Sequence, residues 1–330
     1  MKILAWNLLN IGRTKLTNAL SPTVRAASMG NTVLDYIVKV AMANSVWSGI
    51  DGFLNTSPVD IFMIIELKSG GETKGAAVSG AAIPVLTSIT NAMNTVAGAF
   101  PVSSPFRGKY NYDYVTPQVT GYHECVGLIY NTVSLSFTSD GAHAGVLKDN
   151  VSNRYLLPRT PWWAQLKEKS SNKLVNMVGI HAPPTCSGQS PFMPPVQFSN
   201  LLQNIKTINQ TGIDPKQAVC IMGDFNCDSS DTYAGVSGTV KSFVGMSGYG
   251  YSVKLAAATL TSVRSTIDNE NMKPENYLSG AYDNILINFS TSMAASELDL
   301  IGNAPIYDKS QVAVFNGYRT VSDHLPVILQ

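Results

Sequence analysis

The sequence has few charged residues and almost no net charge. Charged residues make up 14% of its 330 positions and hydrophobic residues 45%, which excludes a disordered chain and the compositions of collagen and coiled coils. The 23 basic and 22 acidic residues leave a net charge of +1. The overall charge therefore gives no attraction to a polyanion, and any nucleic-acid binding must come from a local basic patch.

Cysteine is also scarce. The four cysteines, Cys125, Cys186, Cys220 and Cys227, show neither a Cys-x-x-Cys pair nor the cysteine and histidine spacing of structural zinc sites. We expect reduced, mostly buried thiols, with a disulfide at Cys186 or Cys227 as the alternative for an exported protein. The apolar run after Met1 is too short for a signal peptide, so we expect a cytoplasmic protein, or a secreted one if Met1 replaces a removed signal.

No charged residue occurs between Lys74 and Arg107, and residues 76–100 are numerous enough to cross a bilayer. Pro84, several glycines and many hydroxyl or amide side chains in this run would be costly in lipid. We therefore expect a buried helix here and no membrane insertion. The length fits one domain, residues 1–330, in which an uncharged insertion or lid covers about residues 70–106.

Short apolar runs that end in polar residues recur along the chain. Residues 59–65 predict a buried strand, and Glu66 follows it directly. A glutamate at the tip of a buried strand is costly unless it is paired or binds a cation. Residues 218–222 predict a second buried strand, followed by Gly223-Asp224-Phe225-Asn226. A simple turn is the alternative interpretation of those four residues.

Other expected strands carry similar polar residues near their ends. They cover residues 2–9, 122–130, 174–180, 280–287 and 322–329, with Asn7, Glu124, His181, Asp283 and Asp323-His324 as the polar residues. We expect helices at 24–47 and 196–208 and a loop at 229–247. Carboxylates suit Mg²⁺ or Ca²⁺, histidine transfers protons at neutral pH, and arginine binds phosphate. The pattern predicts metal-assisted phosphoryl chemistry at one edge of two packed sheets flanked by helices.

The polar motifs follow one another in a recognisable order. They are Trp6-Asn7, Ile65-Glu66, Tyr122 with Glu124, Arg159-x-Pro161, His181, Gly223-Asp224-Phe225-Asn226, Tyr282-Asp283-x-Ile285 and Ser322-Asp323-His324-x-Pro326. In this order, over nearly the whole chain, they resemble the endonuclease/exonuclease/phosphatase superfamily, and most closely its DNase I-like branch. The resemblance implies an α/β four-layer sandwich of two packed, mainly antiparallel mixed sheets flanked by helices.

The resemblance also implies a role for each residue in phosphodiester hydrolysis with Mg²⁺ or Mn²⁺, with Ca²⁺ as a further candidate. The implied metal ligands are Glu66, Asn7 and Asp323. The implied catalytic residues are His181, His324, Asp224, Asn226, Asp283 and Glu124. In this set Asp283 orients His324 and Glu124 orients His181. The implied substrate-binding residues are Arg159, Tyr122 and Lys68.

The resemblance favours a monomeric endonuclease that cleaves DNA with little sequence preference. The alternative is a phosphatase or a lipid phosphodiesterase, either sphingomyelinase-like or acting on inositol phosphates. The sequence lacks the Trp-Cys-Asp-Arg that inositol phosphatases show ahead of the position of Ile285, but the uncharged segment keeps a lipid substrate open. A catalytically inactive binding protein fits least, because every catalytic position matches.

Overall fold

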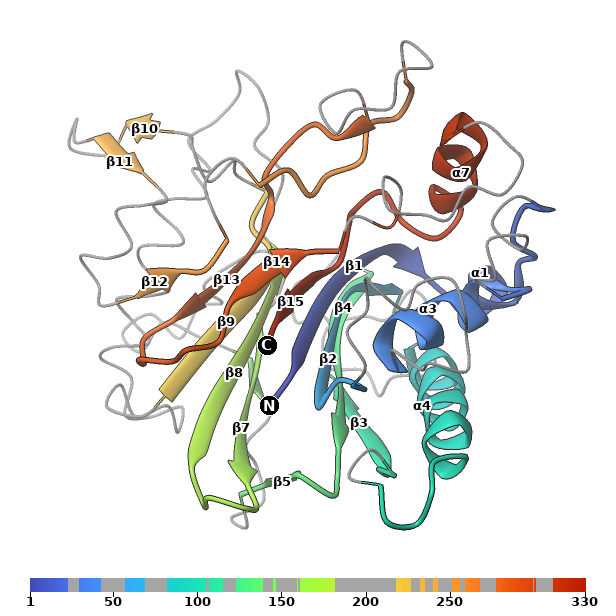
Figure 1. Cartoon of the computed structure of the whole chain (residues 1–330). Coiled ribbons are helices and arrows are strands. Elements are labelled where there is room, and N and C mark those ends of the chain that lie inside the picture. Colours follow the sequence, from blue (N-terminus) through green and yellow to red (C-terminus); the bar gives the residue numbers. More distant parts are fainter. Residues whose placement is uncertain are drawn as a thin grey trace.

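The chain folds into two β-sheets that pack face to face, with helices on the outer face of one sheet (Figure 1). The computed structural model describes residues 1–22, 30–42, 57–68, 82–104, 107–114, 123–138, 145–146, 159, 161–181, 218–226, 232–234, 240–242, 251–255, 259–267, 277–298, 300 and 311–330. The expected two-sheet α/β sandwich is confirmed. Of the helices expected to flank it, the one at 196–208 lies outside the described residues.

The first sheet has six strands in the order β14-β15-β1-β2-β4-β3. Their bounds are Ile3–Ile11 for β1, Ile61–Lys68 for β2, Tyr110–Tyr114 for β3, Glu124–Asn131 for β4, Ala295–Glu297 for β14 and Val327–Leu329 for β15. Strands β1 and β2 run parallel, and the other neighbouring pairs of this sheet are antiparallel. A mainly antiparallel mixed sheet results.

The second sheet has seven strands, in the order β12-β13-β9-β8-β7-β5 with β6 also paired to β7. Their bounds are Leu135–Phe137 for β5, Gly145–Val146 for β6, Trp162–Glu168 for β7, Leu174–His181 for β8, Ala218–Asp224 for β9, Ser252–Val253 for β12 and Asp283–Ile287 for β13. Strands β8 and β9 run parallel. A separate pair, β10 (Thr232–Ala234) and β11 (Val240–Ser242), corrects the loop expected over 229–247, because these segments satisfy each other's backbone groups.

The alternation of side chains along β1 divides the apolar residues between two cores. Ile3 and Ala5 point into the core between the sheets, together with Met177 and Met222 of the second sheet. The two sheets approach closely at Gly179, where a Cβ would lie 2.5 Å from the Val126 Cγ1 atom. A larger residue there would push the sheets apart.

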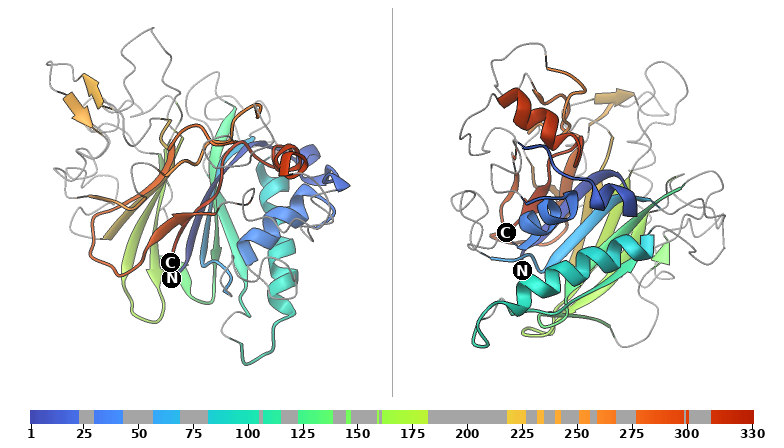
Figure 2. Two further views of the ribbon diagram at one scale, coloured as in Figure 1. Left: turned by 45° about the horizontal axis from the view of Figure 1, so that its top comes forward. Right: turned by 90° about the vertical axis from the view of Figure 1, so that its right-hand side faces the viewer.

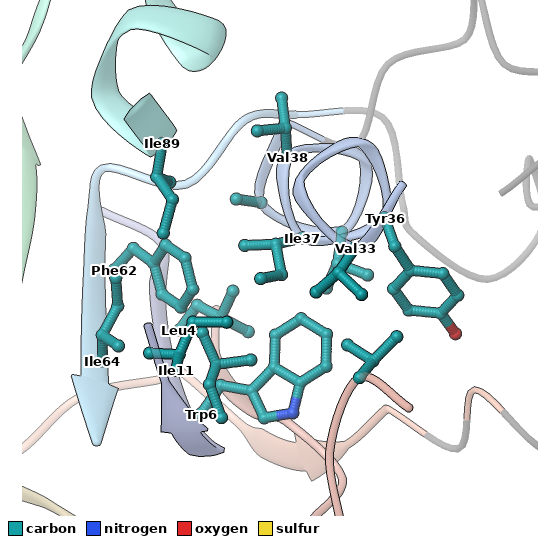
Figure 3. Close-up of a cluster of buried hydrophobic side chains, with 14 of the residues drawn as sticks. Leu4, Trp6, Ile11, Val33, Tyr36, Ile37, Val38, Phe62, Ile64 and Ile89 are labelled. Carbon is teal, nitrogen blue, oxygen red and sulfur yellow. The ribbon is translucent and has the colours of Figure 1, made fainter. Parts of the chain in front are cut away.

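The other face of β1 packs against a layer of helices. The helices are α1 (Arg13–Thr17), α3 (Val33–Met42) and α4 (Ala82–Gly98), which lie on the outer side of the first sheet in both views of Figure 2. Figure 3 shows Trp6 of β1 and Phe62 of β2 among side chains of this layer, such as Ile37 and Ile89. This second core fixes β1 and β2, the strands that carry the first polar site residues.

Helices α3 and α4 both lie in segments where the sequence predicts a helix. Helix α3 begins at Val33, where Thr32 Oγ1 accepts the Asp35 N–H at 3.2 Å and Asp35 Oδ2 accepts the Thr32 N–H at 3.0 Å. Residues 24–29 and 43–47 of the helix expected over 24–47 lie outside the described residues. Helix α4 lies in the uncharged segment and buries one apolar face, as expected for this run. Among the described helices, none is both long and apolar enough to cross a membrane.

Two structural features complete the frame. Helix α7 (Gln311–Tyr318), which sequence patterns did not indicate, precedes β15 and buries Phe315 and Tyr318. Cys125 and Cys220 are buried and take part in no disulfide between described residues, as expected for reduced thiols. Cys186 and Cys227 lie outside the described residues.

Candidate active site

The polar strand ends meet at one edge of the sandwich, away from the two termini marked in Figure 1. Strands β1, β2, β8 and β9 run toward this edge, whereas β4, β13 and β15 start from it. The pairing brings together residues that are distant in sequence, for example His181 beside Asp224 and Asp224 opposite Asp283. The edge gathers Asn7, Glu66, Glu124, His181, Asp224, Asp283 and the Asp323-His324 pair.

His324 is fixed on both its ring and its backbone. Its Nδ1 lies 2.7 Å from Asp283 Oδ2, inside a buried pair. Its carbonyl oxygen accepts hydrogen bonds from Trp6 Nε1 at 2.9 Å and from the Tyr318 hydroxyl at 2.5 Å, and its N–H donates to Ser322 Oγ at 2.9 Å. These contacts leave the imidazole one orientation, with Nε2 toward the site.

The electrostatics around His324 favour the imidazolium. Burial lowers the pKa of His324, but the charges of Asp283, Asp224 and Asp323 and the hydrogen bond that His324 donates to Asp283 outweigh it and raise the pKa to about 10. At neutral pH this ring is therefore a charged proton donor when only protein groups surround it.

His181 has a parallel arrangement on the other side of the site. Its Nδ1 lies 3.0 Å from Glu124 Oε2, the same oxygen that lies 3.5 Å from Arg159 Nε, and the Arg159 guanidinium also contacts His181 Nε2. Burial would raise the pKa of Glu124, but the hydrogen bond and charge of His181 and the charge of Arg159 lower it below its usual value. Glu124 is therefore a stable carboxylate partner for His181.

Asp224 lies between the two histidines. Its Oδ2 is 3.6 Å from Nε2 of both His181 and His324, and its Oδ1 accepts the Asn226 N–H at 2.7 Å. The preceding Gly223 has φ 135°, and a Cβ there would lie 2.1 Å from the Ile180 carbonyl oxygen. Glycine is required at this position, and it lets β9 deliver the buried Asp224 into the site.

Glu66 stands on a strained segment of β2. Its φ is 59°, and the pairing of β2 with β4 shifts register between Ile64 and Leu67. Left-handed backbone at a residue other than glycine costs about 1–3 kcal/mol and persists only where the surroundings hold it. The bulge turns the carboxylate of Glu66 toward the site, with Oε1 3.4 Å from His181 Nε2.

Asn7 joins the two central carboxylates. Its Nδ2 donates to Glu66 Oε1 and to Asp224 Oδ2, each at 3.0 Å, while its Oδ1 accepts the Leu9 N–H at 3.0 Å. The backbone N–H can only donate and the carboxylates accept, so these partners determine which amide atom is nitrogen. In this geometry Asn7 presents its amide nitrogen to the two carboxylates, and its expected role as a metal ligand stays a prediction.

The chemistry of the remaining groups fits a divalent cation. Asp323 Oδ1 is buried without a hydrogen-bond partner among the described residues, which is costly for a carboxylate. Glu66, Glu124 and His181 place ligand atoms within 4.8 Å of one another, and so do Asp224, Asp283 and His324. Carboxylate oxygens of this kind are the ligands that Mg²⁺ and Ca²⁺ prefer.

The expected substrate-binding residues have different positions. Lys68 is exposed at the end of β2, and its stem would lie 3.5 Å from a Cβ at Gly12. Arg159 reaches the site itself, as described above. Tyr122 lies outside the described residues.

The structure adds residues that the motifs did not assign to the site. Lys15 of α1 donates to the Leu8 and Leu9 carbonyls, and Thr261 Oγ1 accepts the Asp283 N–H at 3.0 Å. Burial lowers the pKa of Lys15 to about 8, against the charges of Asp323 and Glu66, which raise it.

The comparisons with known proteins identify the fold. No protein-family model and no curated protein matches the chain. An endonuclease/exonuclease/phosphatase family protein from Leptotrichia buccalis matches with a TM-score of 0.54 and 12% identity, over 100% of this chain and 98% of that one. A family protein from Bacteroides thetaiotaomicron gives 0.52 and 13% over 100% and 96%, and a mannosyl-6-phosphatase of that organism gives 0.52 and 15% over 100% and 98%. With these full-length matches, the chain has the fold of the endonuclease/exonuclease/phosphatase proteins.

Proposed function

We propose that the chain is a divalent-metal-dependent hydrolase of phosphoester bonds, and more specifically an endonuclease that cleaves DNA with little sequence preference. One observation supports this above all. His181 and His324 are each paired through Nδ1 with their own carboxylate, and both direct Nε2 toward Asp224 Oδ2 at 3.6 Å. Two oriented proton carriers around a central carboxylate are suited to in-line displacement at phosphorus.

Each residue has a role that its contacts support. Charged His324 donates a hydrogen bond or a proton to an oxygen of the scissile phosphate. Asp224, held by Asn7 and by the Asn226 N–H, orients the attacking water and accepts its proton. His181, on the other side of Asp224, is the second proton carrier. Mutual orientation of these groups lowers the entropy cost of reaching the transition state.

Glu66 and Asp323 are the residues that would hold the cation. Glu66 is held by two donors that leave other lone pairs open, and Asp323 has a buried oxygen without a partner in the described part of the chain. When bound, a divalent cation neutralises phosphate charge and polarises the phosphoryl oxygen. Asn7 supports this indirectly, since it keeps Glu66 and Asp224 at a fixed separation.

The choice of DNA depends on the basic groups around the edge. Arg159 offers a guanidinium beside His181, and exposed Lys68 extends the positive charge outward along β2. Such groups bind a phosphate backbone without regard to base sequence. Because the net charge is only +1, we expect these local contacts to provide the attraction to the polyanion.

The test is a substrate panel with purified protein. Supercoiled plasmid, RNA, a chromogenic phosphodiester, a chromogenic phosphomonoester and phospholipid vesicles are incubated with Mg²⁺ or with excess EDTA. His324→Ala, purified in parallel, controls for contaminating nucleases. We expect plasmid and diester hydrolysis with Mg²⁺ only. Hydrolysis of the monoester or of lipid alone would reassign the substrate, and equal activity of the His324→Ala protein would contradict the proposed site.

A further inference from the structure

Lys15 has an unusual position for a lysine near a cluster of acids. Its ammonium donates to backbone carbonyl oxygens, Leu8 O at 2.8 Å and Leu9 O at 2.7 Å, rather than forming a direct ion pair with one of the described acids. The side chain is partly buried, and the carboxylates of Asp323 and Glu66 lie near enough to act on its charge. The helix that carries Lys15 is thereby tied to the end of β1.

The two carbonyls belong to a kink in β1. Leu9 and Asn10 have φ values of 45° and 53°, a left-handed conformation that side chains other than glycine rarely adopt. The pairing of β1 with β2 shifts register at the same place, between Asn7 and Ile11. Such a kink persists only if its surroundings hold it, and Lys15 holds the carbonyl side.

The N–H groups of the same kink point to the site. Leu9 N–H donates to Asn7 Oδ1 at 3.0 Å, and Asn10 N–H donates to Glu66 Oε2 at 2.9 Å. One N–H therefore orients the amide that joins the carboxylates, and the other orients the carboxylate that would hold the cation. A change in the kink would move both groups at once.

We propose that Lys15 is a positioning residue which, by holding the Leu9-Asn10 kink, keeps Glu66 and Asn7 in the arrangement that binds the divalent cation. This assignment rests on the proposed function, in which Glu66 binds a divalent cation. Groups that orient metal ligands typically change metal affinity by about 10- to 100-fold when they are removed.

The sign of the effect separates positioning from simple charge. A positive group beside Glu66 and Asp323 repels a cation, so loss of its charge alone would tighten metal binding. Loss of the hydrogen bonds that hold the kink would instead weaken it. Lys15→Met removes the charge and the donors together while keeping a long apolar stem, so the two explanations predict opposite shifts in affinity.

Calorimetric titration of the protein with Mn²⁺ measures that shift without any substrate. For Lys15→Met we expect binding weaker than wild type by about tenfold or more. Lys15→Gln keeps an amide donor but no charge, so it should bind Mn²⁺ more tightly than Lys15→Met, and Lys15→Leu, which lacks both, serves if Lys15→Met does not fold. Mn²⁺ binding equal to or tighter than wild type in folded Lys15→Met or Lys15→Leu would overturn the assignment.

Lys2→Met is the matched control. Lys2 is a buried lysine at the other end of β1 whose ammonium donates to the Ser57 carbonyl at 2.8 Å. Its loss should lower the melting temperature and leave Mn²⁺ affinity unchanged, and an equal loss of affinity would show that the effect of Lys15 is only structural. A wild-type protein that binds Mn²⁺ but hydrolyses no phosphoester contradicts the proposed function alone, whereas one that binds no divalent cation overturns both.

Discussion

Asp283→Asn is the most informative single change, since it removes the charge that faces His324 and little else. The His324 Nδ1 and Asp283 Oδ2 atoms are 2.7 Å apart, with only 7% and 3% of the two residues exposed. Asparagine keeps the volume and one oxygen of the carboxylate. It no longer stabilises the imidazolium, and it no longer fixes which ring nitrogen carries the proton.

The magnitude follows from the pKa of His324. Burial lowers it, but Asp283, Asp224 and Asp323 raise it from 6.5 to about 10. The folded-state pKa is the higher one, so the stabilisation is complete below pH 6.5 and is lost as the pH rises through about 10. At about 1.4 kcal/mol for each tenfold change in proton affinity, the full effect is on the order of 5 kcal/mol. Of the three carboxylates, Asp283 raises the pKa of His324 most. We therefore expect Asp283→Asn to reduce the loss of unfolding free energy between pH 6.5 and 10 by about 1–3 kcal/mol.

Two measurements test this expectation. Urea unfolding in EDTA, at several pH values between 6.5 and 10, should show a flatter fall in the free energy of unfolding for Asp283→Asn than for wild type. Plasmid nicking with Mg²⁺ should fall by about 10²- to 10⁴-fold, the range for a proton carrier that loses its orienting carboxylate.

A control at the opposite end of the sheets makes the result specific. Asp60 accepts hydrogen bonds from Ser134 Oγ at 2.9 Å and from the Lys2 N–H at 2.8 Å. Asp60→Asn should lose stability but keep its turnover. Wild-type turnover in Asp283→Asn, or turnover lost only in step with unfolding, would refute the reasoning.

Three further predictions concern the same edge of the sandwich. Glu66→Gln should nearly abolish plasmid nicking, as should excess EDTA, because both remove the charge pairing of carboxylate and cation; full turnover in EDTA would contradict this. His181→Ala and His324→Ala should each lower turnover by about 10²-fold or more, and the double change should cost much less than the product of the two single losses. Turnover and melting temperature are measured for all three variants. Lys68→Ala should weaken plasmid binding and its salt dependence but leave hydrolysis of a small diester unchanged, and equal losses on both substrates would show a role in chemistry. Arg159→Ala should reduce turnover of both substrates, because Arg159 contacts His181.

Buried strands with polar ends were predictable from the sequence, because a run of apolar residues is followed directly by a polar residue. Strand β2 is continuously apolar up to Ile65 and then reaches Glu66, and β9 does the same up to Asp224. The strand alternation and the order of the motifs were enough to place these residues at one edge. The prediction needed one further condition, namely a topology that brings these strand ends to the same edge of the sandwich.

Short edge elements were not predictable in the same way. Strands β12 and β14 span two or three residues, and their pairing depends on neighbours that are far away in the sequence. Helix α7 contains Asn316 and Gly317, which are poor helix formers, and its burial of Phe315 and Tyr318 is a tertiary effect. Local propensity contains no information about such contacts.

Orientation within the site was also beyond the sequence. The motif placed Asn7 beside the carboxylates, but the direction of its amide depends on the Leu9 N–H and therefore on a left-handed kink. Likewise, the Arg159-x-Pro161 motif suggested a residue that only binds substrate, whereas its guanidinium contacts both Glu124 and His181. Backbone geometry and three-dimensional neighbours decide such details.

The pairing of β1 with β15 affects how the protein is made. Ala5 pairs with Val327, and the Trp6 indole donates to the His324 carbonyl, 318 positions later in the chain. A ribosome must therefore translate the codon for His324, and release that segment from its exit tunnel, before the site can be complete. A chain that stops upstream of His324 lacks both this residue and the strand that pairs with β1, so it cannot form the complete site.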